Sequence, residues 1–151
     1  MKITIYLTGK KGSQLYSLAL DYIKKANFDT SIDVILLNPS GFNGESARNK
    51  ESQNILAKLN KDDILWLLDE KGIQISSIQL ANKIEKAKIL SRNISIIIGG
   101  AYGVNEELRS KVDFVWSLSE LIFPHEIAWL LVGEQLYRAG QINKNSGYHH
   151  S

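Results

Sequence analysis

Residues 94–103 have the sequence ISIIIGGAYG, in which four isoleucines and one serine run directly into a glycine-rich segment. A continuous run of branched apolar residues is typical of a strand buried on both faces of a parallel sheet. Ligands of such sheets lie beyond the carboxyl ends of the strands, where glycines let backbone amides approach a ligand closely. The spacing matches neither a dinucleotide fingerprint nor a phosphate-binding loop. The segment therefore predicts either a ligand-binding loop or a tight turn without a ligand.

Other short apolar runs predict four more strands, and stretches with helical periodicity separate them. The predicted strands are 2–7, 32–37, 64–68 and 113–118. Helices are predicted after a Ser13 cap, after Ser76 and Ser77, at 105–110, and from Pro124 to about Ala139. A further helix is predicted to include Ile55, Leu56 and Leu59, with a largely solvated first half in the polar stretch 43–53. Strands alternating with helices indicate an α/β fold with a mainly parallel sheet covered on both faces. We expect a single domain over residues 1–151.

The composition excludes several kinds of chemistry. The chain has 151 residues and no cysteine, which rules out disulfides, thiolate-held zinc, iron–sulfur clusters and a cysteine nucleophile. All three histidines (His125, His149 and His150) lie near the C-terminus, so we expect no metal site. The sequence also lacks a Ser-His-Asp arrangement, a His-Glu-x-x-His motif and a carboxylate pair at helical spacing, so hydrolytic chemistry is not indicated.

The charge balance gives no direct case for nucleic-acid binding, because 18 basic and 16 acidic residues leave a net charge of +2. A partner held by a few residues or by a dimer groove remains compatible with this balance. No apolar stretch is long enough to span a bilayer, and the N-terminus lacks the pattern of a signal peptide. We therefore expect a soluble cytoplasmic protein without membrane contact.

Two loops after predicted strands are candidate ligand sites. Asp69 is a candidate acceptor for a ligand hydroxyl or amide, although residues 69–72 are more simply interpreted as an exposed turn with Gly72 at positive φ. The loop 118–125 is apolar, and exposed apolar side chains are costly unless something covers them. Its backbone and side chains could hold a planar heterocycle, or the loop could dock on its own core. His125, at a helix start, is either structural or catalytic.

The C-terminal stretch offers a third candidate. Arg138 follows a helical segment, and Tyr148, His149 and His150 end a polar tail. Such tails are usually frayed. An aromatic beside a histidine can instead stack on a base, while an arginine meets a phosphate.

Seven short motifs occur in order along the whole chain. They are MKITI at 1–5 with Gly9-Lys10, Leu68-Asp69 with Gly72 and Ser76-Ser77, Ile98-Gly99-Gly100 with Gly103, Ser117-Leu118-Ser119, Phe123-Pro124-His125, EQLYRA at 134–139, and Tyr148-His149. In this order, and in a chain of this length, the set resembles the RlmH family, the bacterial 23S ribosomal RNA pseudouridine N3-methyltransferases of the SPOUT class. The resemblance covers essentially the whole chain.

The resemblance implies a SPOUT-type α/β knot, with a deep trefoil knot in the C-terminal half. It also implies a homodimer packed through the first and last helices, with the active site near the interface, acting on 23S rRNA in the ribosome. The implied cofactor is S-adenosyl-L-methionine. Its implied contacts are Leu68, Gly99, Leu118, Ser119, Glu120, Leu121, Ile122 and Phe123.

The same resemblance assigns Arg138, Tyr148 and His149 to placement of the pseudouridine and to removal of its proton, with His125 as a second candidate for that removal. Positioning of the acceptor nitrogen supplies most of the catalysis, because the sulfonium already activates the methyl group. Two chains could concentrate basic residues around one RNA groove. The candidate lysines are Lys10, Lys11, Lys24 and Lys25.

Four positions depart from the family pattern. Glu126 stands where the family has glutamine, Trp129 where it has arginine, and Gly147 where it has proline, while residues 119–122 replace Ser-Lys-Met-Thr. These changes remove positive charge near the presumed RNA site, and Trp129 could stack on a base or pack at a dimer interface. The expected function is N3-methylation of pseudouridine. The alternatives are a knotted module that binds the ribosome or cofactor without methyl transfer, and an unrelated flavodoxin-like domain.

Overall fold

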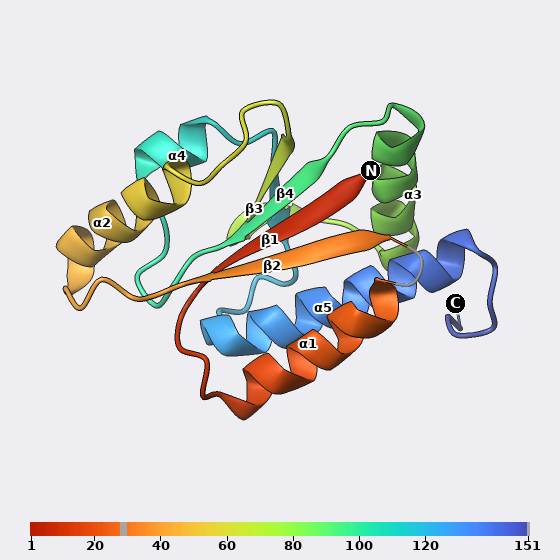
Figure 1. The fold of residues 1–151 in the computed structure, drawn as a ribbon, viewed down its shortest axis with the longest axis horizontal. Helices are drawn as coiled ribbons and strands as arrows, with labels where there is room; N and C mark the ends of the chain where they lie inside the picture. The colour runs from red at the N-terminus through yellow and green to blue at the C-terminus, as the bar shows by residue number, and fades with distance from the viewer. Residues whose placement is uncertain (28–29, 151) are drawn as a thin grey trace.

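The structure, a computed structural model, describes residues 1–27 and 30–150; Ser151, the end of the predicted domain, lies outside the described residues. Figure 1 shows a central sheet with helices on both faces. The elements in chain order are β1 (Lys2–Thr8), α1 (Gln14–Ala26), β2 (Ser31–Leu37), α2 (Gly44–Leu56), β3 (Ile64–Gln74), α3 (Ser77–Ile89), β4 (Ile94–Ile98), α4 (Glu106–Ser110), β5 (Phe114–Ser117) and α5 (His125–Asn143). The predicted α/β architecture is confirmed.

The sheet has the strand order β2-β1-β4-β3-β5, and every neighbouring pair is parallel. β4 is the central strand, and each of its residues is buried. Alternate side chains of β4 enter two different cores because neighbouring residues of a strand point to opposite faces. Ile96 packs with α1, α3 and α5, whereas Ile97 packs with residues of α2 and α4. The continuous apolar run of β4 is thus explained by helices on both sides.

The predicted helix starts are confirmed at two serines. Ser13 accepts hydrogen bonds from the backbone amides of Leu15 and Tyr16, and Ser76 forms a capping box with Gln79. The polar residues before Ile55 do form a helix, α2, but it ends at Leu56. The last helix runs beyond the predicted end near Ala139 to Asn143. The trefoil knot implied by the resemblance stays a prediction.

The interpretation of residues 69–72 as a turn is wrong, because β3 continues through them to Gln74. After an irregularity between Leu68 and Ile73, the strand pairs again with β5. Gly72 does not have a positive φ. A Cβ there would overlap the carbonyl oxygen of Val115, so glycine is needed for the close approach of the two strands rather than for a turn.

The suggestion that Trp129 stacks on a base is also wrong. Its side chain is 1% exposed and lies in the core of its own chain. The ring makes edge-on contacts with Tyr16 and His125, at centroid distances of 5.7 Å and 5.3 Å. A Cβ on Gly9 would overlap the indole ring. The glycine after β1 therefore provides the space that this tryptophan fills.

Replacing Gly9 tests that packing. We expect Gly9→Ala to lower the free energy of unfolding by about 1–3 kcal/mol, because the new methyl group overlaps a buried ring in a packed core. Urea denaturation measures the change. Gly12→Ala is the matched control, since the same turn has no atom within 4 Å of a Cβ at Gly12. Equal stability of the two variants would contradict the packing role of Gly9.

Candidate functional site

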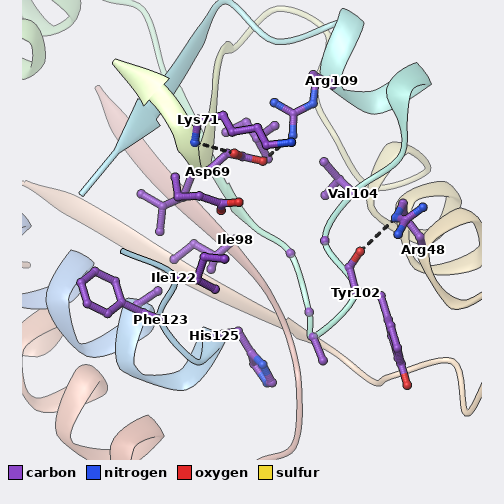
Figure 2. Close-up of a pocket in the computed structure, with 18 of the residues that line it drawn as sticks. Arg48, Asp69, Lys71, Ile98, Tyr102, Val104, Arg109, Ile122, Phe123 and His125 are labelled. Carbon is purple, nitrogen blue, oxygen red and sulfur yellow. Dashed lines mark hydrogen bonds and ion pairs between the residues drawn. The ribbon is translucent and has the colours of Figure 1, made fainter. Parts of the chain in front are cut away.

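The carboxyl ends of the central strands open into a cleft of about 1410 Å³ (Figure 2). Its walls are the end of β3, the glycine-rich loop after β4, the loop 118–125 and side chains from α2 and α4. Small-molecule sites usually occupy about 300–1,000 Å³. The cleft is therefore large enough for a cofactor together with part of a second substrate.

Seven of the eight predicted cofactor residues line this cleft, and His125 lines it as well. The seven are Leu68, Gly99, Leu118, Ser119, Leu121, Ile122 and Phe123. Glu120 is exposed and is not among the lining residues. Residues far apart in the sequence thus meet in one place because parallel strands end at the same edge of the sheet.

The glycine-rich loop is both a tight turn and a wall of the cleft. The amide of Gly103 donates to the carbonyl of Gly100 at 3.0 Å, and Gly103 has a φ of +74°. A Cβ on Gly99 would lie 3.1 Å from Cγ1 of Val104. The motif is thus a tight turn whose residues line the cleft, and ligand binding there stays a prediction.

The loop 118–125 docks on its own core only in part: Leu118 packs against the core, whereas Leu121 and Ile122 do not. Leu121 and Ile122 are 69% and 80% exposed, although apolar side chains of this size are usually covered. Ser117 donates to the carbonyl of Ser119 at 2.8 Å, and the amide of Leu121 donates to the hydroxyl of Ser119 at 3.1 Å. The serines shape the loop, and its apolar side chains stand at the cleft, where a ligand would cover them.

Asp69 lies in the cleft, but its carboxylate already has partners in the chain. One oxygen forms a short ion pair with Arg109 of α4, and the other accepts from the amide of Lys71 at 2.8 Å. Figure 2 shows both contacts at one end of the cleft. Asp69 therefore joins β3 to α4 rather than presenting an unpaired carboxylate to a ligand.

Arg138, Tyr148 and His149 form a second cluster, away from the cleft. Glu134 holds it together: Oε1 accepts from Nη2 of Arg138 at 2.7 Å and from the hydroxyl of Tyr148 at 3.1 Å. Arg138 also lies 3.1 Å from Nδ1 of His149, and Tyr148 packs edge-on against Tyr137. The tail is thus folded back on α5 rather than frayed.

The contacts set the protonation of this cluster. The hydrogen bond to Glu134 raises the pKa of Arg138 above its ordinary value. Burial raises the pKa of Tyr148, and the hydrogen bond to Glu134 raises it further. A guanidinium carries only donors, so Arg138 donates to Nδ1 of His149. The cluster is therefore joined internally, because Arg138 and Tyr148 both donate to the carboxylate of Glu134.

Sequence reasoning missed Glu134 as a functional residue. It belongs to the EQLYRA motif, and its spacing of four residues from Arg138 places the two side chains on one helix face. That spacing could have predicted the contact between Glu134 and Arg138. Tyr148 was a predicted site residue, but its contact with Glu134 was not predictable because it depends on the fold-back of residues 144–150.

Within a single chain, the cluster of Arg138, Tyr148 and His149 lies far from the cleft. His125 and Arg138 are separated by 13 residues of the same helix, which corresponds to about 20 Å along its axis. The predicted catalytic residues are therefore divided between two ends of α5, with His125 at the cleft and the other three at the far end.

The cleft suits S-adenosylmethionine in shape and in chemistry. Exposed apolar side chains of the loop 118–123 can cover an adenine ring, and the backbone around Gly99 can approach the ligand without interference from a Cβ. Within residues 1–27 and 30–150, no three or more His, Cys, Asp or Glu side chains gather as metal ligands would, and no helix is long and apolar enough to cross a membrane.

Comparisons with known proteins agree with the fold and the cleft. A family model described as "Predicted SPOUT methyltransferase" matches residues 1–149. Ribosomal RNA large subunit methyltransferase H of Methylobacillus flagellatus is 33% identical over 154 residues, and that of Malacoplasma penetrans is 36% identical over 157; each alignment covers 99% of both chains. The solved structure of a "probable methylase family protein" from Haemophilus influenzae has a TM-score of 0.56 at 15% identity, covering 99% of this chain and 70% of that one.

SPOUT methyltransferases use S-adenosylmethionine, and the cleft has the residues to hold it. The full-length matches, together with this cleft at the strand ends, place the chain among these enzymes. It belongs to the SPOUT methyltransferases and, within them, to the ribosomal RNA large subunit methyltransferase H family.

Proposed function

We propose that this chain methylates N3 of a pseudouridine in large-subunit ribosomal RNA, on the assembled ribosome. The observation that carries the proposal is the convergence of three distant segments on one cleft at the strand ends. The names of the relatives support an rRNA substrate. Such a substrate would place the protein in the cytoplasm with the ribosomes.

When bound, S-adenosylmethionine supplies an activated methyl group. We assign to Leu68, Gly99 and the loop 118–123 the task of holding it with backbone groups and apolar side chains. Positioning the acceptor nitrogen in line with the methyl group is then the main contribution of the protein. For Glu120, a contact with the cofactor through its backbone stays a prediction.

The C-terminal cluster suits placement of the nucleotide better than removal of its proton. Arg138 is a cation suited to a phosphate or a base edge. Tyr148 stays protonated because its pKa is raised, and Nδ1 of His149 already accepts from Arg138. We therefore assign acceptance of the N3 proton to His125, which lines the cofactor cleft.

The separation of the two groups supports a homodimer. A rigid helix keeps the tail cluster about 20 Å from the cleft of its own chain, so a second copy must bring its tail to this cleft. The outer side of α5 has half-exposed apolar residues, namely Ile127, Leu130 and Leu131. Leu18 on the adjacent α1 is 48% exposed. These side chains are suited to an interface through the first and last helices.

The four lysines proposed for RNA binding do not form one group in a single chain. Lys10 and Lys11 precede α1, whereas Lys24 and Lys25 lie in its last turn. Nζ of Lys25 lies 5.4 Å from the ring centroid of Tyr22 and 6.0 Å from that of Tyr137. Lys25 therefore adjoins the aromatic side of the tail cluster, and we assign it to the RNA backbone there.

The test of this function uses purified protein, labelled S-adenosylmethionine and ribosomes from a strain that lacks the enzyme. Methyl incorporation at N3 of a pseudouridine supports the proposal. Cofactor binding without incorporation would instead support the alternative module that has lost methyl transfer.

Substitutions in the tail should separate catalysis from cofactor binding. We expect His149→Ala and Tyr148→Phe to lower the rate of rRNA methylation, the former by about 100-fold, because a group that positions the reacting base is lost. Calorimetry should show an unchanged affinity for S-adenosylmethionine. His150→Ala, at the exposed neighbour, is the control and should retain activity.

Mixing two inactive variants tests whether two chains share one site. Gly99→Val blocks the cleft, since even a Cβ there lies 3.1 Å from Val104, and His149→Ala disables the tail. If each site combines the cleft of one chain with the tail of the other, unfolding and refolding the two together should restore part of the activity. Failure to restore activity in verified heterodimers would contradict a shared site.

A further inference from the structure

Helix α2 is unusually polar for a helix packed on a sheet. Among its 13 residues, GESARNKESQNIL, only Ala47, Ile55 and Leu56 are apolar. Such a helix gains little stability from apolar burial. Specific polar contacts fix it instead, and several of these reach the glycine-rich loop that lines the cofactor cleft.

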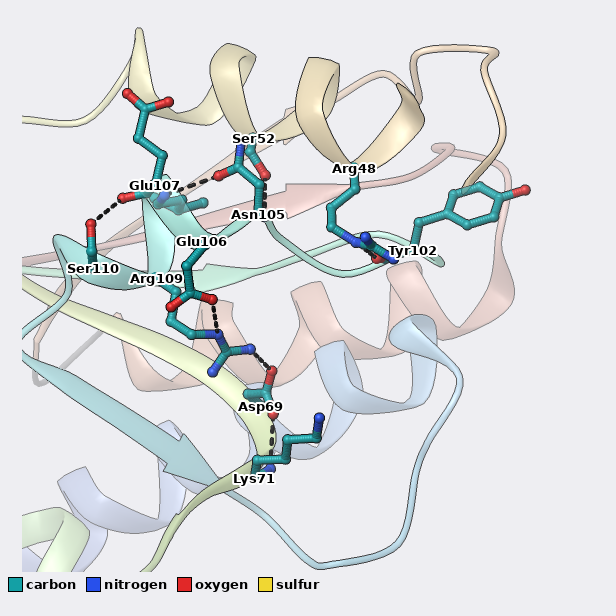
Figure 3. Close-up of polar contacts among 11 residues, drawn as sticks. Arg48, Ser52, Asp69, Lys71, Tyr102, Asn105, Glu106, Glu107, Arg109 and Ser110 are labelled. Carbon is teal, nitrogen blue, oxygen red and sulfur yellow. Dashed lines mark hydrogen bonds and ion pairs between the residues drawn. The ribbon is translucent and has the colours of Figure 1, made fainter. Parts of the chain in front are cut away.

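Two side chains of α2 hold backbone groups of that loop (Figure 3). Nε of Arg48 donates to the carbonyl of Tyr102 at 3.0 Å, and the hydroxyl of Ser52 accepts from the amide of Asn105 at 2.9 Å. These contacts lie on either side of Gly103, where the backbone has positive φ. They hold the chain in place on both sides of its sharpest turn.

A third contact involves a buried charge. Glu51 is 5% exposed, and a buried carboxylate is costly unless hydrogen bonds compensate it. Its Oε2 accepts from the amide and the hydroxyl of Ser40 at 3.0 Å and 2.9 Å. A Cβ on Gly100 would lie 3.0 Å from Oε1, so the carboxylate rests directly against the start of the loop.

The loop therefore lies between the cleft and the buried Glu51 and Ser52, whereas Arg48 also lines the cleft itself. One side of residues 100–105 contacts Arg48, Glu51 and Ser52, while the same residues line the cleft. Ser52 and Glu51 do not themselves line the cleft. Any effect they have on a bound cofactor must pass through the loop.

We propose that α2 positions the cofactor loop, with Arg48, Glu51 and Ser52 as positioning residues that hold the backbone of residues 100–105 in the form that receives S-adenosylmethionine. A loop ordered in advance loses less conformational entropy when the ligand binds. Binding must in turn stabilise the docking of α2, because the coupling is reciprocal. The proposal rests on cofactor use by this site and is independent of the RNA substrate.

Ser52→Ala is the principal test, because Ser52 is buried behind the loop. The amide of Asn105 loses its acceptor, so we expect the Kd for S-adenosylmethionine and for its product S-adenosylhomocysteine to rise about fivefold by calorimetry. Hydrogen exchange should be faster at residues 100–105 and should slow again when cofactor saturates the variant. In the methylation assay, KM for the cofactor should rise while kcat stays near the wild-type value.

Arg48 provides a second test that tolerates substitution, since its side chain is only half-buried. Arg48→Met removes the donor to Tyr102 and should weaken cofactor binding, whereas Arg48→Lys keeps a donor and should restore much of it. Lys50→Met is the matched control, because it removes one positive charge from an exposed position of the same helix.

Two results would overturn the proposal. In one, Ser52→Ala and Arg48→Met bind cofactor within twofold of wild type, whatever happens to their melting temperatures. In the other, Lys50→Met weakens binding as much as Arg48→Met, so that charge alone explains the loss. Wild-type protein that binds cofactor but leaves rRNA unmethylated would contradict the proposed function and leave this inference standing.

Discussion

The parallel pairing of β4 between β1 and β3 is the constraint on which the rest of the molecule depends. A strand hydrogen-bonded on both edges and covered on both faces is mostly apolar. All five residues of β4 are buried, and its one polar residue, Ser95, donates a hydrogen bond to Asp63 at 2.8 Å. Parallel direction also brings the ends of β3, β4 and β5 to one edge. Neither the cleft nor its loops would exist if any of these strands ran the other way.

The two helix layers serve different purposes. The layer of α1, α3 and α5 is packed through a large apolar core that includes Trp129. The layer of α2 and α4 covers a much smaller core, formed by Ile55, Leu67, Ile97 and Leu108, and is held to the cleft by hydrogen bonds and ion pairs. The first layer provides stability, and the second places backbone groups with the directional accuracy that polar contacts give.

The sequence allowed the sheet, the capped helices and most of the cleft to be predicted, because apolar runs and turn residues report local conformation and burial. The incorrect predictions concern residues whose role is determined by tertiary contacts. Gly72 looked like a turn residue, but its missing side chain makes room for Val115 on the neighbouring strand. Trp129 looked available for a base, but Gly9 leaves a space that it fills. The cluster around Glu134 depends on a fold-back that no local pattern specifies.

The small size and low net charge of the chain have a consequence for RNA binding. A net charge of +2 gives the chain little overall attraction for RNA, and the buried Trp129 supplies no cation. Near the candidate substrate residues, at the far end of α5 from the cleft, Arg138 is paired with Glu134, and Lys25 adds a further positive charge. If the tail cluster contacts RNA as proposed, the fixed length of α5 means that RNA contacts and cofactor would meet only across two chains. Association would therefore be a condition of catalysis rather than an aid to stability.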